Sequence, residues 1–398
     1  MSTLPANRTD LMTPAVVQTI QRRSLIVGMM AGVIAVIGVI VRPAEFFPAY
    51  LLGFMAWLGV TLGCMAILML QHMTGGRWGL VIRRILEAGT RTLPLMALLF
   101  IPILFGLPRL YEWARPEDVA KDKHLQMLAH AYLHFSAFLV RAVIYFVIWG
   151  VLAYFLNRWS AEQDVPHTQD ISRRLRAISG PGLVLYAFAM SFAAIDWAMS
   201  LSPHWISTIY PLLFVAGQGL SALGFVVAIE DILFRYRPMS ELLKPTEVHD
   251  HGKLILTFVM LWAYFSFSQW LIIWAGNLPE EISWYVRRLS GGWAFVGLAL
   301  ALFHFGVPFI LLLSRSLKRD VRKLVWLAIW LIFMRGVDLF WMIEPTFHER
   351  LHVTVWDIVL PFAIGGFWLA LFFRNLQQRP LLPLHDPHTP EILEPAHE

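Results

Sequence analysis

Five ionisable residues interrupt long apolar stretches of the sequence: Arg141, Asp196, His304, Arg335 and Asp338. A charged side chain inside a lipid bilayer is costly unless it is paired or hydrated, so such residues are seldom accidental. Carboxylates and imidazoles exchange protons readily in a low dielectric, because their pKa values shift with the surroundings. We therefore expect these residues to form a proton pathway, with or without a quinone pocket.

The spacing of these residues leaves two other interpretations open. Arg335 and Asp338 are three residues apart, on one helical face, where they can pair. In this structural interpretation Arg335, Asp338, Arg141 and Asp196 form buried ion pairs that only lock helices together. His134 precedes Arg141 by seven residues, and because His134 and His304 belong to different apolar runs, they could also ligate a haem b.

Other polar residues are weaker candidates. His204, in the short segment Ser202–Trp205, is either a surface proton acceptor or part of a tight turn. Gln269 could line a pocket, although interhelical hydrogen bonding is the commoner role for such a residue. The single cysteine, Cys64, excludes disulfides, cysteine-ligated metal centres and covalently attached haem within the chain. Any electron carrier must therefore come from elsewhere, and no metal site is expected in this chain.

The composition indicates which elements position these residues. Of the 398 residues, 58% are hydrophobic and only 15% are charged, and 17 are Trp. A soluble protein could not bury so much apolar surface, so we expect an all-α polytopic membrane protein. Ten apolar runs are long enough to cross a bilayer as helices. The predicted spans are Leu25–Val41, Ala49–Leu70, Leu93–Leu107, Tyr132–Phe155, Pro181–Leu201, Ile206–Ile229, Leu254–Ala275, Trp293–Leu313, Leu324–Ile343 and Val355–Phe373.

The Lys and Arg residues predict the orientation of these spans. Of the 32 Lys and Arg residues, 22 lie in the N-terminal segment, in every second loop and in the C-terminal segment. The remaining loops contain eight, and two lie inside spans. Positive residues accumulate on the cytoplasmic side, so both termini are predicted to be cytoplasmic. The intramembrane candidates then fall in the middle or periplasmic half of the bilayer. The net charge of +5 is explained by the cytoplasmic arginines and implies no nucleic-acid partner.

Three segments outside the spans have their own expected structure. Gly76–Arg91 alternates apolar residues with arginines, which predicts an interfacial amphipathic helix on the cytoplasmic surface. Leu107–His130 mixes acids and bases and is expected to form a periplasmic cap. The proline-rich tail from Gln377 is expected to be extended and mobile. The expected division of the chain is a cytoplasmic N-terminal segment (1–23), a ten-helix membrane domain (24–376) and a mobile cytoplasmic tail (377–398).

Long, spaced motifs resemble one known family. They include the uninterrupted stretch Ile195–Tyr210, and the similarity covers about Gly76–Phe373. The other matching segments and residues are Gly76–Gly79, Arg83–Arg84, Leu110–Trp113, Arg141, His251–Leu254, Trp262, Tyr264, Ser268, Gln269, Asn277–Glu281, His304–Phe305, Pro308–Phe309, Lys318–Arg319, Arg335, Asp338 and Trp341. They are similar to the second quinone-binding-type membrane subunit of bacterial alternative complex III, which belongs to the polysulfide-reductase membrane-anchor (NrfD-like) family.

The resemblance implies two four-helix bundles, helices two to five and six to nine, flanked by the first and tenth helices. It implies a subunit of a respiratory quinol:cytochrome c or quinol:oxidase oxidoreductase in the bacterial inner (cytoplasmic) membrane. The implied partners are lipids, a homologous quinol-binding membrane subunit, iron–sulfur and multihaem cytochrome c subunits, and a terminal oxidase. No cofactor would be bound covalently to this chain; the implied small-molecule ligand is quinone or menaquinone, while partners would carry haem c and iron–sulfur clusters.

The resemblance also implies roles for the candidate residues. The residues that fall on matching positions are Arg141, Asp196, His304, Arg335 and Asp338. Members of the family are associated with proton translocation, which suggests a half-channel formed by Asp196, His304, Arg335 and Asp338. His134 departs from the family pattern, where Asn is usual. Two alternatives are a quinol-oxidising site with His304 and Asp338 as proton acceptors, and a purely structural or stand-alone membrane paralogue.

Overall fold

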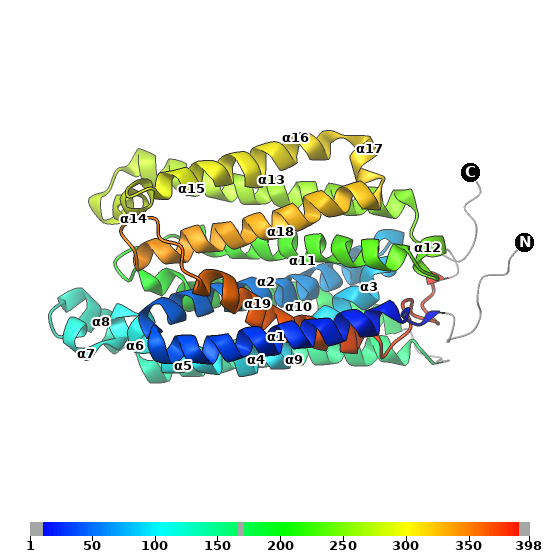
Figure 1. Ribbon diagram of the computed structural model, residues 1–398, viewed down its shortest axis with the longest axis horizontal. Helices are drawn as coiled ribbons and strands as arrows, with labels where there is room; N and C mark the ends of the chain where they lie inside the picture. Colours follow the sequence, from blue (N-terminus) through cyan, green and yellow to red (C-terminus); the bar gives the residue numbers. More distant parts are fainter. Residues whose placement is uncertain (1–10, 166–170, 390–398) are drawn as a thin grey trace, which may run out of the picture.

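Helices dominate the computed structural model, which describes residues 11–165 and 171–389 (Figure 1). In this part of the chain, ten helices or runs of helices are long and apolar enough to cross a membrane. The predicted all-α polytopic architecture is thereby confirmed. The candidate spans are Val16–Val41, Pro43–Thr74, Arg77–Phe105, Phe135–Glu162, Ile171–Leu201, Tyr210–Phe234, Pro245–Gly276, Trp293–Leu313, Val321–Thr346 and Trp356–Leu376.

Some spans are single helices and others are composite. The single helices are α1 (Val16–Val41), α2 (Pro43–Thr74), α9 (Phe135–Glu162), α11 (Tyr210–Phe234), α13 (Pro245–Gly276) and α19 (Trp356–Leu376). The composite spans are α3 (Arg77–Thr90) with α4 (Leu93–Leu99) and α5 (Ile101–Phe105), α10 (Ile171–Trp197) with η3 (Met199–Leu201), α15 (Trp293–Ala299) with the π-helix η4 (Leu300–Gly306) and α16 (Val307–Leu313), and α18 (Val321–Ile343) with η5 (Glu344–Thr346). Pro94 and Pro102 each stand in the first turn of a short helix in the third span, where a missing N–H is tolerated.

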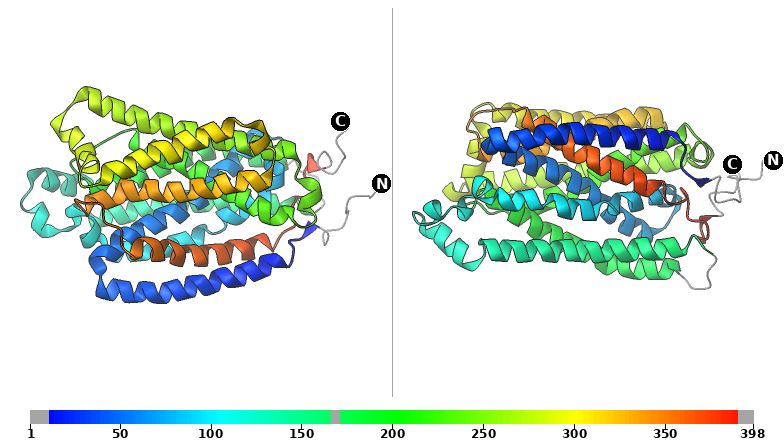
Figure 2. Two further views of the ribbon diagram at one scale, coloured as in Figure 1. Left: turned by 45° about the horizontal axis from the view of Figure 1, so that its top comes forward. Right: turned by 60° about the horizontal axis from the view of Figure 1, so that its bottom comes forward.

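The spans pack as the two expected bundles. One contains α2, α3–α5, α9 and α10, and the other contains α11, α13, α15–α16 and α18. The bundles meet where α2 contacts α11, and these two spans are the most enclosed, with 83% of each apolar window buried. The flanking helix α19 packs on α2, and α1 lies along α19 on the outside (Figure 2).

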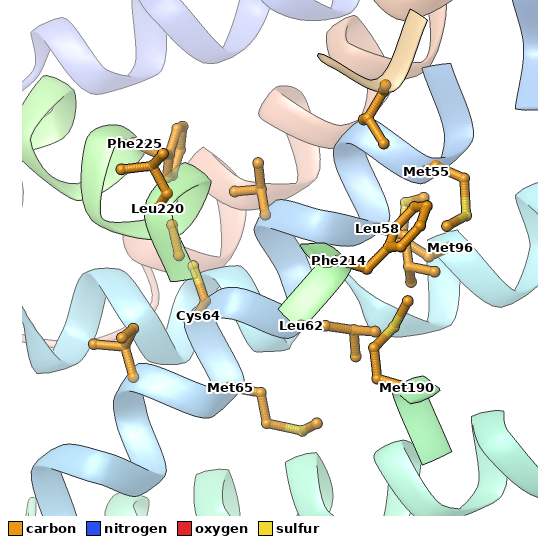
Figure 3. Packing of buried hydrophobic residues seen from close by; sticks show 14 of the residues in the cluster. Met55, Leu58, Leu62, Cys64, Met65, Met96, Met190, Phe214, Leu220 and Phe225 are labelled. Carbon is orange, nitrogen blue, oxygen red and sulfur yellow. The ribbon is translucent and has the colours of Figure 1, made fainter. Parts of the chain in front are cut away.

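The contact between α2 and α11 depends on small residues. A Cβ at Gly63 of α2 would lie 2.0 Å from the carbonyl oxygen of Gln218 of α11, so only glycine permits this approach. Around the crossing, flexible thioethers and aromatic rings fill the irregular space between helices. Figure 3 shows several of these side chains: Met55, Met65, Met96, Met190 and Phe214.

Both ends of the described chain lie at the same end of the bundles (Figure 1). An even number of spans requires this arrangement, but which side of the membrane it faces stays a prediction from the charge distribution.

The predicted cap, Leu107–His130, is folded into short helices. The shorter elements are α6 (Leu107–Leu110), η2 (Glu112–Ala114), α7 (Pro116–Val119), α8 (Lys123–Ala131), α12 (Met239–Leu242), α14 (Pro279–Leu289) and α17 (Arg315–Lys318). Of these, α7, α8 and α14 lie at the end opposite the described termini.

The prediction of a surface helix at Gly76–Arg91 is wrong. Helix α3 packs against α2, α11, α13 and α19, and nearly all of its residues are buried. Arg83 and Arg84 are buried too, because both pair with Glu87 on the same helix, at 3.0 and 2.7 Å. An arginine-rich face can point to water or to buried acids, and the sequence pattern alone does not distinguish them.

The tail also differs from the extended segment that we expected. Between residues 377 and 389 it packs against the protein, with Leu382 fully buried. Arg379 donates to Glu87 at 3.1 Å, and Asp386 accepts from Arg83 at 2.9 Å. Residues 390–398 of the tail and 1–10 of the N-terminal segment lie outside the described residues.

Candidate functional site

Arg335 and Asp338 form a buried ion pair within α18. The Arg335 guanidinium donates to Oδ2 of Asp338, and the indole N–H of Trp262 on α13 donates to the same oxygen at 3.0 Å. The two charged side chains are only 5% and 4% exposed. The spacing of three residues along a helix produces this pairing directly. The carboxylate therefore has one cationic and one neutral donor.

His304 lies beside this pair, in the π-helix η4. Its ring is edge-on to the Trp262 ring, with the two centroids 4.3 Å apart. The side chain is completely buried, and within the described part of the chain neither Nδ1 nor Nε2 has a hydrogen-bond partner. An imidazole with two unoccupied nitrogens can either accept or donate a proton. Single π-helical turns inside α-helices are frequent at functional sites.

Helix α11 provides the space for the arginine. A Cβ at Gly217 would lie 2.2 Å from Cζ of Arg335, so the absence of a side chain there makes room for the guanidinium. Cζ also lies 5.5 Å from the centre of the Phe214 ring. We call Trp262, His304, Arg335 and Asp338 the central cluster. All four belong to the second bundle.

Arg141 and Asp196 form a different cluster, in the first bundle. Two guanidinium nitrogens of Arg141 donate to the two carboxylate oxygens of Asp196, at 2.8 and 2.9 Å. The Tyr145 hydroxyl donates to the same carboxylate at 2.7 Å. Arg141 also donates to the Tyr132 carbonyl at 2.9 Å and lies 3.8 Å from the centre of its ring. Such bidentate pairing fixes α9 against α10.

The structure thus divides the predicted pathway residues between two clusters. His304, Arg335 and Asp338 lie together, whereas Asp196 is held by Arg141. His134 caps the exposed start of α9, where its ring accepts from the Ala137 N–H at 3.3 Å. His134 and His304 occupy different bundles, so the structure gives no support to the haem interpretation.

The remaining candidates have ordinary hydrogen-bond partners. His204 is half-exposed and lies 3.0 Å from a carboxylate oxygen of Asp122 in the cap. Gln269 is buried, donates to the Tyr285 hydroxyl at 3.2 Å and accepts from the Ser207 hydroxyl at 2.9 Å. Gln269 therefore joins α13 to α14 and to the loop before α11, which contains Ser207. This matches the interhelical hydrogen-bonding role.

The sequence did not predict a second buried pair, between Glu230 and His251. Glu230, near the end of α11, lies 3.1 Å from Nδ1 of His251, near the start of α13, and both side chains are fully buried. Nε2 of His251 is 2.7 Å from the Trp78 carbonyl oxygen. The sequence signal is weak, because Glu230 follows the predicted span Ile206–Ile229 by one residue and His251 precedes the next span.

A second unpredicted feature is the network around α3. The Ser160 hydroxyl of α9 donates to Glu87 and accepts from Arg83, while Arg84 donates to Asp164. Burial raises the pKa of the Asp164 carboxyl above its usual value. The spacing of Arg83 and Glu87, one helical turn apart, could have indicated a pair. The partners from α9 and from the tail could not be inferred from spacing.

Metal-ligating side chains are not clustered in the described part of the chain. Within residues 11–165 and 171–389, no group of three or more His, Cys, Asp or Glu side chains could hold a metal ion. A cavity of about 570 Å³ opens beside the cap and is lined in part by Glu45, Arg109, Arg115 and His348. It is large enough for a small ligand but does not include the central cluster.

Comparison with known proteins adds no assignment. No protein-family model matches the chain, and no curated protein matches it. The family resemblance therefore rests on the sequence motifs themselves.

Proposed function

We propose that this chain is a membrane subunit of a respiratory quinol:cytochrome c or quinol:oxidase oxidoreductase of the alternative complex III type, and that its central cluster transfers protons. The observation that carries the proposal is the buried Arg335–Asp338 pair beside His304, whose ring nitrogens have no partner within the described residues. Ionisable groups that face the interior of a helix bundle are typical of proton relays in membrane proteins.

Charge balance suggests how the cluster would work. While Arg335 is paired with Asp338, the two side chains carry no net charge. If a nearby redox-linked charge moves Arg335 away, the carboxylate is left uncompensated, and proton uptake restores neutrality. His304 is positioned to deliver or accept that proton. Trp262 keeps its hydrogen bond throughout, because the oxygen of either form of the acid accepts from the indole.

The wider assembly is inferred from the motifs, which include the central cluster as well as Arg141 and Asp196. We infer a bacterial inner-membrane location with both termini in the cytoplasm. We also infer a homologous quinol-binding membrane subunit and partners that carry iron–sulfur clusters and haem c, with a terminal oxidase downstream. The only cysteine is buried Cys64, so thiolate-held electron carriers belong to the partners.

A quinol site at the same cluster is the second candidate. One ring nitrogen of His304 would accept a hydrogen bond and then the first proton from a quinol hydroxyl, and Asp338 would take up the second proton. The two electrons would pass to an iron–sulfur cluster of a partner subunit. The Arg141–Asp196 pair, in contrast, has every carboxylate oxygen occupied and fits a structural role.

The test is Asp338→Asn in the assembled enzyme, reconstituted in vesicles. A proton-transfer role predicts fewer protons translocated per electron, with quinol oxidation continuing. Loss of quinol oxidation itself, together with weaker labelling of α13 and α18 by a photoreactive quinone, would favour the second candidate. Asp320→Asn is the matched control, because Asp320 caps the other end of α18 and Asn preserves that cap. Unchanged proton stoichiometry in Asp338→Asn would rule out the proposal.

A further inference from the structure

Arg288, in α14, is a buried cation without an acidic partner. Its side chain is 1% exposed, and its guanidinium donates only to main-chain carbonyls: to Trp341 and Trp284 at 3.1 Å and to Met342 at 2.6 Å. No carboxylate in the described part of the chain forms an ion pair with it. Burial lowers the pKa of Arg288 to about 9, which leaves it charged at neutral pH. A buried charge of this kind favours an anionic ligand.

A second unsatisfied group lies next to it. Trp205 is 2% exposed and its indole N–H has no acceptor among the described residues. Its ring stacks on Trp284, with the centroids 4.6 Å apart, while the Arg288 guanidinium lies 3.5 Å from the centre of the Trp284 ring. An arginine, two indoles and an unused N–H therefore converge between α14 and the Ser202–Trp205 segment.

These side chains line a cavity of about 100 Å³. Helix α14, which contributes Trp284 and Arg288 to it, lies at the end of the molecule opposite the described termini (Figure 1). Its wall adds the exposed cation Arg287 and the hydroxyls of Ser202 and Ser283. Glu112 is the one acid in the wall, so the two arginines leave an excess of positive charge. His204, also in the wall, lies 3.0 Å from Asp122.

The donors indicate the chemistry of the ligand. The Ser283 hydroxyl already donates to the Glu280 carbonyl at 2.9 Å, so the donors left for a ligand are the arginines, the Trp205 indole N–H and the Ser202 hydroxyl. Together they favour a group that accepts several hydrogen bonds and carries negative charge, which is an oxyanion. Pockets for whole ligands usually measure about 300–1,000 Å³. A cavity of about 100 Å³ instead accommodates one anionic group of a larger molecule that continues outside.

The surroundings indicate where that larger molecule lies. Helix α14 exposes Val286 and Leu289, and Ile206 is exposed beside the Trp205 segment. Apolar side chains next to an arginine on an amphipathic helix are typical of the membrane interface, the depth at which phospholipid phosphates lie. A soluble acidic partner would not require this apolar rim. We propose that the cavity binds the phosphate of a phospholipid headgroup, with Arg288, Arg287 and Trp205 as its main ligands.

The test uses the full chain, purified and delipidated in an uncharged detergent, with binding of phosphatidylglycerol followed by native mass spectrometry. Trp205→Phe keeps an aromatic ring against Trp284 but removes the pyrrole part of the indole together with its N–H, and Arg287→Gln removes an exposed charge without touching the core. Each should raise the dissociation constant about tenfold, the effect of one hydrogen bond to a charged group. Trp149→Phe and Arg350→Gln are the matched controls and should bind like the wild type. Trp149 is a buried tryptophan away from the cavity whose indole N–H also has no acceptor among the described residues, and Arg350 is exposed like Arg287.

A second experiment identifies the source of the oxyanion. A photo-crosslinking amino acid at position 283, in the wall of the cavity, should label lipid when the chain is irradiated in its native membrane. A protein adduct instead of a lipid adduct would contradict the proposal, and so would competition by inorganic phosphate as strong as that by phosphatidylglycerol. Equal lipid binding by all four variants would also overturn it.

Discussion

The coupling between Arg335 and Asp338 can be measured as a free energy. Arg335→Met leaves the buried carboxylate with Trp262 as its only donor, and Asp338→Asn leaves the guanidinium without a counter-charge. Removing one member of a buried pair costs about 3–5 kcal/mol, and both side chains here are at least 95% buried. Each single variant should therefore be less stable than the wild type by about that amount.

The double variant, Arg335→Met with Asp338→Asn, should regain most of this loss. It contains no uncompensated charge, and the Asn carbonyl still accepts from Trp262, so the remaining deficit should be about 1–2 kcal/mol. The assay is the unfolding free energy of the purified chain in mixed micelles for all four members of the cycle. A double variant as unstable as the sum of the two singles would show that the residues do not compensate each other, and would refute the pairing on which the cluster depends.

Two further predictions follow from the same structure. Gly217→Ala places a methyl group 2.2 Å from Cζ of Arg335 and must displace the guanidinium, so proton translocation should fall. The control is Gly336→Ala, which should leave proton translocation unchanged because there is open space around its Cβ position. His348, outside the spans, has a pKa raised by the Glu344 carboxylate, which lies 3.3 Å from its Nδ1. Its stabilising contribution should therefore be complete below about pH 6.5 and disappear as the pH rises through the raised pKa. Unfolding midpoints of His348→Gln and the wild type should therefore converge at high pH, and a constant difference across the range would contradict this.

The sequence predicted the helices well because apolar length determines which segments can cross a membrane. It also predicted the Arg335–Asp338 pair, since residues three apart on a helix meet regardless of the rest of the fold. The proximity of His304 to that pair depends on how η4 packs against α13 and α18. Spacing along the chain carries no information about that packing.

The failures have related physical causes. The predicted proton pathway placed Asp196 with His304, Arg335 and Asp338, because hydropathy gives depth in the membrane but not the neighbouring helix. The pairing of Asp196 with Arg141, 55 residues away, agrees instead with the alternative of buried ion pairs. Helix α3 was placed on the surface because its arginines suggested water. The acids that balance their charge are Glu87 and Asp386. Asp386 lies 303 residues from Arg83, and only the packing of the tail against α3 brings the two side chains together.

The central claim is that Asp338 changes its protonation state during turnover. Redox-induced infrared difference spectroscopy of the assembled enzyme tests this most directly, because a protonated carboxyl group gives a C=O stretching band that the carboxylate lacks. We predict a difference band in the wild type that is absent in Asp338→Asn and retained in Asp320→Asn. The same band in all three enzymes, or no carboxyl band in any of them, would contradict the claim.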